Sequence, residues 1–300
     1  MRLPAWSRFF DAGTSSGSGR TAAQADWRLY SFEEAPPTLQ YNKYIRSGYR
    51  AGLSYGQCLG SMLCCHNETG NILTHLLPAL VMLGMLAYDM LAPWPHARLE
   101  YWQNWGSILL CFCLSVAYHT FSANHHHYDT WLRLDVCGVL LVLVGGGHMV
   151  LWWGFHCHPM LRMAFALCYY TAGAACLFAA VNARSSRARA ASMLVLLLLR
   201  VGSFVVRLVV SPHASPALWH YLAMEAYSLV GGTVNALRVP ERWFQPRDPQ
   251  LPGPLDYWLN SHQIMHVMVA LAMLHLHLGA THDYHLVMSI RQGALQCAAL

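Results

Sequence analysis

Seven apolar runs, each close to 20 residues long, limit what this chain of 300 residues can fold into more than any other feature. A helix needs roughly 20 apolar residues to cross the hydrocarbon core of a bilayer, which is about 30 Å thick. Within that core each backbone N–H and C=O must be paired, so only helices and closed barrels cross it. The runs therefore predict seven membrane-spanning helices, over residues 72–91, 101–121, 133–152, 159–181, 190–210, 217–237 and 262–281.

The composition agrees with a membrane protein. Hydrophobic residues make up 55% of the chain and charged residues only 11%, whereas about a quarter of the residues are charged in an average soluble protein. The third and fourth spans are the least regular, because "GGGHM" and "WWGFHCHP" interrupt their apolar pattern, so six or eight spans stay open as alternatives. The predicted fold class is an all-α membrane protein, a seven-transmembrane helix bundle.

The positive charges fall mostly on one side of the predicted bundle. With the N-terminus in the cytosol, fourteen Lys and Arg side chains lie on the cytosolic side and three on the opposite side. Cytosolic loops of membrane proteins carry such an excess. The pattern predicts a cytosolic N-terminus and an extracytosolic C-terminus, and it accounts for the net charge of +5 without a nucleic-acid partner.

Four segments are expected along the chain. Residues 1–37 have no apolar pattern, which predicts a disordered cytosolic tail. Residues 38–70 mix apolar, aromatic and basic residues, as helices lying at the cytosolic interface do. The seven-transmembrane domain takes residues 71–285, and residues 286–300 form an extracytosolic tail. The ten cysteines are scattered and several lie within spans, so a disulfide framework has little support.

Polar residues gather where three spans meet the cytosolic boundary. The second span ends there with Ser115 and His119 four positions apart, and the third begins there with Asp135 in its first turn. The last span begins there with His262 and His266, which share one face because they are also four positions apart. At 1.5 Å per residue, all five lie within roughly 10 Å of the inner hydrocarbon edge. Ionisable groups are costly at such depths, so each is a functional candidate.

Three neutral imidazoles that leave a fourth position open are the ligand set of a catalytic Zn²⁺ site. Taken alone, the pair His262 and His266 fits helix packing as well as metal binding, and His119 alone fits packing better. Their convergence with Asp135 favours the metal site.

The base of such a site has to come from another helix. In soluble zinc proteases a Glu follows the first His and acts as the base, but Gln263 follows it here. Asp135 is the carboxylate at the right depth to accept a proton from the attacking water or to orient that water. Ser115 could hydrogen-bond the substrate or the water, or it could simply bond the backbone or pack against a neighbouring helix.

Other ionisable residues have simpler interpretations. His75 and His148 each stand alone in a span and are interpreted as helix-packing residues. Arg200 and Glu225 lie at comparable depth and predict an ion pair that stabilises the bundle. The loop histidines are interpreted as solvated: His125, His126 and His127. Further histidines lie near the outer face and cannot share the inner metal: His156, His158, His275, His277, His282 and His285. A second site there has no further support in the sequence.

Four motifs in this order, "HNETGNILTH", "SVAYHTF", "RLDVCG" and "NSHQIMH", resemble those of the progestin and adipoQ receptor family, which includes the adiponectin receptors. The match extends over about residues 38–282. The resemblance implies a seven-helix bundle with a cytosolic N-terminus and a lipid-filled cavity that opens toward the bilayer. It also implies site roles: zinc held by His119, His262 and His266, and a water held by Asp135.

Two further residues take roles from the resemblance. Ser115 completes the family's S-x-x-x-H pattern. Arg189 corresponds loosely to a basic residue that meets the lipid at the start of the fifth span.

The same resemblance implies a role in sphingolipid chemistry. The family and its relatives, which include alkaline ceramidases, are associated with hydrolysis of ceramide to sphingosine and a fatty acid. The stretches "YNKYIRSGYR", "LVGGTVNALRVPERW" and "LDYWLNSHQIMH" most resemble one branch of the family, which implies control of ceramide levels and a Golgi or other endomembrane address, with the plasma membrane as the alternative. We expect a zinc-dependent, ceramidase-like lipid amidase or a regulator of ceramide levels, with ceramide, sphingosine and free fatty acid as its lipid partners.

Two other interpretations stay open. In the first, the protein is a non-enzymatic receptor or scaffold whose zinc only ties helices together, and it binds sphingolipid-metabolising enzymes or a signalling ligand. In the second, it is a proton-driven channel of the haemolysin III kind, which shares related motifs. The oligomeric state is not indicated by the sequence.

Overall fold

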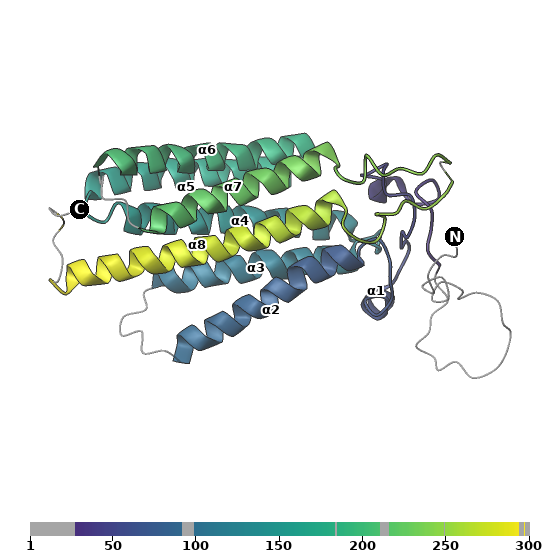
Figure 1. Cartoon of the computed structure of the whole chain (residues 1–300), viewed down its shortest axis with the longest axis horizontal. Helices are drawn as coiled ribbons and strands as arrows, with labels where there is room; N and C mark the ends of the chain where they lie inside the picture. Colours follow the sequence, from purple (N-terminus) through teal and green to yellow (C-terminus); the bar gives the residue numbers. More distant parts are fainter. Residues whose placement is uncertain are drawn as a thin grey trace, which may run out of the picture.

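The chain folds into a bundle of long helices that run along one axis (Figure 1). A computed structural model describes residues 28–91, 99–183, 185–210, 216–248, 250–293 and Cys297, without the side chains of residues 99–101 and 186. Within these ranges the long helices are α2 (Thr69–Leu91), α3 (Leu99–Phe121), α4 (Tyr128–Gly154), α5 (Pro159–Val181), α6 (Ser186–Val210), α7 (Pro216–Leu237) and α8 (Ser261–Arg291). Each of the seven predicted ranges lies within one of these helices.

Five of the helices are long and apolar enough to cross a membrane: α2, α4, α5, α6 and α8. The other two, α3 and α7, have 23 and 22 residues and lie among them, but they carry polar residues such as Asn104 and His220. The protein is therefore an all-helical membrane bundle. That all seven helices cross the membrane stays a prediction.

Three consecutive glycines lie inside α4 without ending it. A Cβ atom at Gly147 would come within 2.3 Å of the Tyr169 ring on α5, and one at Gly146 within 2.7 Å of Leu276 on α8. Small residues at such positions allow membrane helices to approach closely. The "GGGHM" stretch, which interrupts the apolar pattern, is thus the place where α5 and α8 pack against α4.

Two buried ion pairs join the helices. The predicted pair is confirmed: Arg200 on α6 donates to both carboxylate oxygens of Glu225 on α7. A second pair was not predicted. Arg207 donates to Asp283 at 2.8 and 2.6 Å, and the hydroxyl of Tyr221 donates to the same carboxylate at 3.1 Å. Because each buried charge has a hydrogen-bonded partner, the desolvation penalty is offset.

At the end of the bundle that bears the N-terminus, the chain forms a cap of loops (Figure 1). The sequence predicts one or two interfacial helices over residues 38–70, and the described part of this segment contains two short helices, η2 (Pro37–Leu39) and α1 (Tyr55–Ser61). Their place at a membrane interface stays a prediction. Residues 28–37 are ordered, and Tyr30 pairs with Tyr49 through two backbone hydrogen bonds. The predicted disordered tail otherwise falls on residues 1–27, which lie outside the described residues.

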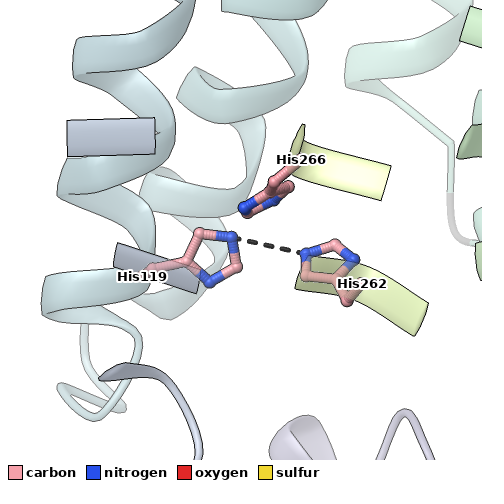
Figure 2. Close-up of side chains that lie close together, drawn as sticks. All are labelled: His119, His262 and His266. Atoms are coloured by element: carbon pink, nitrogen blue, oxygen red, sulfur yellow. Dashed lines mark hydrogen bonds between the residues drawn. The ribbon is translucent and has the colours of Figure 1, made fainter. Parts of the chain in front are cut away.

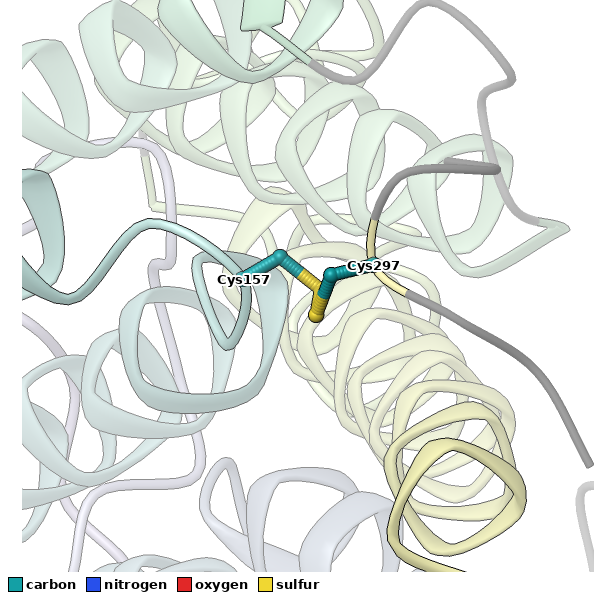
Figure 3. Close-up of a disulfide and its surroundings, with 2 residues drawn as sticks. All are labelled: Cys157 and Cys297. Atoms are coloured by element: carbon teal, nitrogen blue, oxygen red, sulfur yellow. A yellow bond between two sulfur atoms is a disulfide. The ribbon is translucent and has the colours of Figure 1, made fainter. Parts of the chain in front are cut away.

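The opposite end differs from the prediction in two ways. Helix α8 continues to Arg291, so the first part of the predicted tail at 286–300 is helical. A disulfide joins Cys157, in the turn between α4 and α5, to Cys297 (Figure 3). The scattered cysteines offered little support for a disulfide, and the two residues of this one are 140 positions apart in the chain. Disulfides persist in oxidising compartments, which favours an extracytosolic position for this end of the bundle.

Candidate metal centre

The three predicted histidine ligands meet at the capped end of the bundle. His119 lies in the last turn of α3, and His262 and His266 lie in the first two turns of α8 (Figure 2). The three residues each offer a ring nitrogen, and these nitrogens lie within 4.8 Å of one another. His119 and His266 are buried, and His262 is partly accessible. The convergence expected from depth alone is therefore present in the structure.

Two of these rings form their hydrogen bonds to the surrounding protein through Nδ1, which turns Nε2 toward the other histidines. The Nδ1 atom of His119 donates to Glu68 Oε2 at 2.7 Å, and the Nδ1 atom of His266 donates to the backbone carbonyl of Asn71 at 3.2 Å. A ring that donates from Nδ1 keeps the lone pair on Nε2 when it is neutral. The Nε2 atoms of His119 and His262 are 3.4 Å apart. Tetrahedral zinc with bonds of 2.0–2.1 Å would hold two nitrogens about 3.3 Å apart, so the donor set fits zinc.

Glu68 is the site residue that the sequence interpretation missed. It lies just before α2 and is 6% exposed, and its carboxylate accepts hydrogen bonds from His119 Nδ1, Asn71 Nδ2 at 2.6 Å and the hydroxyl of Tyr41 at 3.1 Å. Burial alone would raise the pKa of the Glu68 carboxyl, but the hydrogen bonds and charge of His119 and the Asn71 amide hold that pKa below its ordinary value. An ionised Glu68 thus fixes the orientation of His119, as carboxylates do behind metal-bound histidines.

A second set of polar residues lies beside the three histidines. Ser115 Oγ is 2.7 Å from His75 Nδ1. The His75 ring stacks on the His266 ring with 3.7 Å between centroids. Ser115 is 2% exposed, whereas Asp135, on the neighbouring helix α4, is partly accessible. The structure therefore links Ser115 and His75 to His266 in one chain of contacts. The interpretation of His75 as a lone packing residue missed this position.

Backbone contacts in the cap hold the ligand-bearing helix ends in place. Arg50 is 2% exposed and donates to the carbonyls of His119 at 2.7 Å and Thr120 at 3.3 Å, so it satisfies the free C-terminal carbonyls of α3. At the start of α8, Asn260 accepts from the backbone N–H of His262 and Gln263, both at 3.2 Å. These contacts hold the end of α3 and the start of α8 in place, and with them the side chains of His119 and His262.

The side chain of Gln263 stabilises the start of α8 through hydrogen bonds, and its amide is not a base. Its amide bonds the backbone of Leu259 at 2.7 Å and of Tyr257 at 2.8 Å. A Cβ atom at Gly70 would come within 2.2 Å of the Gln263 amide nitrogen, so glycine at that position lets α2 approach α8. The side chain after the first histidine is thus committed to holding the helix start.

Arg189 lies in the first turns of α6, where Nη1 donates to the carbonyl of Ala183 at 3.2 Å. The hydroxyls of Tyr128 and Tyr118 are 3.3 Å apart, and the Tyr118 ring lies 4.8 Å from the His119 ring. Lipid binding by Arg189 stays a prediction.

Comparison with known proteins gives consistent results. Residues 63–277 match the family described as haemolysin-III related. The chain is 36% identical to progestin and adipoQ receptor family member 4 from Mus musculus, over 85% of this chain and 93% of that protein. It is 28% identical to the adiponectin receptor protein of Drosophila melanogaster over 86% of this chain and 60% of that one, and 28% identical to progestin and adipoQ receptor family member 3 from Mus musculus over 83% of each.

Proposed function

Because this chain belongs to the haemolysin-III-related proteins and, among them, to the progestin and adipoQ receptor family, we propose that it is a zinc-dependent intramembrane lipid amidase of the ceramidase type. The observation that carries the proposal is the cluster of His119, His262 and His266, with Asp135 on α4, the helix that packs against α3. When bound, zinc would supply a Lewis acid that polarises an amide carbonyl and acidifies water. The proposed substrate class is ceramide, and the proposed products are sphingosine and a free fatty acid.

The residues of the chain have distinct parts in this proposal. Asp135 accepts the proton of the attacking water and returns it to the amide nitrogen as the carbon–nitrogen bond breaks, so the acyl group gains the hydroxyl and the amine gains the hydrogen. Ser115 donates its hydroxyl hydrogen to Asp135 and keeps that carboxylate oriented. Glu68 holds His119 from behind. Asp135 is accessible where Ser115 is buried, which is the arrangement that a base facing substrate requires.

A non-enzymatic receptor or scaffold is the second candidate function. One observation favours it: the histidines join the end of α3 to the start of α8, and the same helix ends are held by the cap through Arg50 and Asn260. A metal at this point would tie two helices and the cap together even without turnover. Such a protein could regulate ceramide by binding sphingolipid-metabolising enzymes.

The proposal includes a topology and a location. We infer that α2 to α8 all cross the membrane with the N-terminal cap in the cytosol, which brings the metal centre to the cytosolic boundary. A Golgi or other endomembrane location suits an enzyme that acts on ceramide, and the plasma membrane is the alternative.

Turnover of a fluorescent ceramide by the purified full-length protein separates the two functions. We expect wild type to hold zinc and release fatty acid, Asp135→Asn to hold zinc without releasing fatty acid, and His266→Ala to lose both. A wild type that holds stoichiometric zinc but releases no more fatty acid than Asp135→Asn would rule out the amidase and leave the scaffold. A zinc-free wild type that is no more stable than His266→Ala would rule out both.

A further inference from the structure

A second group of histidines lies on the outer surface of the bundle, where α7 and α8 run side by side (Figure 1). His220 is on α7, and His275 and His282 are on α8, seven positions apart and so on nearly the same face. His220 and His275 are half-buried and His282 is exposed. We refer to these three residues as the outer histidine cluster.

The geometry of the outer histidine cluster brings imidazole nitrogens from both helices together. The Nδ1 atoms of His220 and His275 are 3.0 Å apart. The rings of His282 and His275 also lie close to that of His220, with 5.3 and 5.2 Å between centroids. His220 is therefore in contact with both histidines of α8.

This arrangement has no part in the stability contacts already described. The nearby ion pair of Arg207 and Asp283 is buried on the inner side of α8. The face that carries the cluster also exposes Trp219, 72% of whose surface is accessible. Polar groups on an exposed face of a membrane bundle are costly and therefore candidates for function.

The geometry points to a second metal site, at which the outer histidine cluster binds a divalent late transition metal such as Zn²⁺. Neutral imidazole suits these ions, and bonds of 2.0–2.1 Å at angles between 90° and 110° hold two nitrogens about 2.9–3.4 Å apart. The 3.0 Å separation of His220 and His275 falls in this range. His282 supplies the third nitrogen after a rotation of its exposed side chain, and water completes the shell.

The two metal sites are separate. His275 follows His262 by thirteen positions, about 20 Å along α8 at 1.5 Å per residue. One ion cannot be shared over that distance. Because His282 is exposed and the inner histidines are largely buried, a chelator is expected to remove metal from the outer site first.

Zinc stoichiometry of the purified full-length protein tests the second site. At saturating Zn²⁺, elemental analysis after gel filtration is expected to give two equivalents for wild type and one for the double variant His220→Gln/His275→Gln. The variant His262→Ala/His266→Ala is expected to keep one equivalent, which a mild chelator removes. Glutamine keeps hydrogen-bonding capacity at both positions, and His282→Gln alone should lower the affinity of the outer site about tenfold or more, by loss of one of three ligands.

The matched control is His125→Gln/His126→Gln. These two exposed loop histidines have ring centroids 3.9 Å apart, but they are neighbours in one turn and do not join two helices. The control should retain both equivalents. Equal zinc content in wild type and His220→Gln/His275→Gln, or no zinc in His262→Ala/His266→Ala, would overturn the second site. Neither result depends on ceramide turnover, so the proposed amidase stands or falls separately.

Discussion

At the scale of single residues, Glu68 decides how the metal centre is built. His119 can present either ring nitrogen to the other histidines, and a neutral ring with its hydrogen on Nε2 would point a donor at the place where a metal would lie. The Glu68 carboxylate, 2.7 Å from Nδ1, draws the hydrogen to the far side of the ring. The negative charge also makes Nε2 a better ligand.

Replacing Glu68 by glutamine should therefore weaken zinc binding. The amide keeps the size of the side chain and can still accept a hydrogen bond, but it removes the charge, so we expect an affinity loss of about 10- to 100-fold. Competition with a zinc-binding dye measures the loss. Glu34→Gln is the control, because Glu34 forms an exposed ion pair with Arg28 in the same cap. Equal affinities of the two variants would contradict the assigned role of Glu68.

His66 gives the cap a dependence on pH. Burial and then the positive charge of Arg50 lower the pKa of His66 to about 3, and its Nδ1 accepts from the N–H of Glu68 at 3.1 Å. In the unfolded chain the pKa is about 6.5, so between these values the unfolded state binds more protons and folding weakens as pH falls. At pH 5 the loss reaches about 2 kcal/mol.

Thermal unfolding between pH 7 and pH 5 should show this effect. The midpoint temperature of wild type is expected to fall more steeply with acidification than that of His66→Asn, whose amide oxygen can accept the same hydrogen bond without titrating. His125→Asn, at an exposed position, should follow wild type. Parallel curves for wild type and His66→Asn would show that the pKa of His66 is the same in the folded and unfolded states.

The three histidines could be grouped from the sequence, but not the residues that support them. Residues at the same distance from one membrane boundary lie at one level in the bundle. This was enough to group His119, His262 and His266 with Asp135. Glu68 precedes its helix, and its contact with His119 depends on which side of α3 the chain passes. His75 lies in α2, and only the packing of α2 against α8 brings it to His266. Neither arrangement is encoded in periodicity or depth.

At the scale of elements, the start of α8 is the part that the metal centre depends on most. Two of the three histidines occupy its first two turns, and the backbone N–H groups of the first turn have no partner within the helix. Asn260 accepts from two of these groups. The side chain and backbone N–H of Ser261 donate to Glu241, which is 1% exposed. These contacts prevent fraying at the turn that carries His262.

Asn260→Ala should destabilise the protein by about 1 kcal/mol through loss of the cap and should also weaken zinc binding. Ser54→Ala is a matched control, because Ser54 caps α1 through a capping box and α1 carries no ligand. Both variants should lower the unfolding temperature, and only Asn260→Ala should lower the affinity for zinc. Equal zinc affinities would mean that metal binding does not depend on this cap.

The long helices could be predicted and the cap could not. Each apolar run fixes one helix, because the bilayer leaves its backbone no alternative. Residues 38–70 carry the composition of interfacial helices, yet their order comes from distant partners: Asn42 donates to Glu241, and the N–H of Arg46 donates to Asp256. Contacts over about 200 positions leave no local signal in the sequence.

At the scale of the whole molecule, the disulfide constrains how many helices cross the membrane. Cys157 and Cys297 are separated by α5, α6, α7 and α8. Two residues in one disulfide lie on the same side of the membrane, so an even number of these four helices must cross. Of the four, α7 is the one that is long enough, with 22 residues, but not apolar enough to count as a candidate span. If α7 alone stayed out, the parity would be odd, so the bond supports crossing by all four.

The number of helices that cross between two cysteines then predicts on which side of the membrane each cysteine lies. Cys64 and Cys65 are exposed and precede α2, and three helices separate them from Cys157. In sealed microsomes, a membrane-impermeant maleimide should label wild type at Cys64 and Cys65 without permeabilisation, and Cys64→Ser/Cys65→Ser should lose that label. Cys157 and Cys297 should react only after both permeabilisation and reduction. Labelling of Cys157 or Cys297 in intact vesicles under reducing conditions would contradict the cytosolic cap, and with it the placement of the metal centre at the cytosolic boundary.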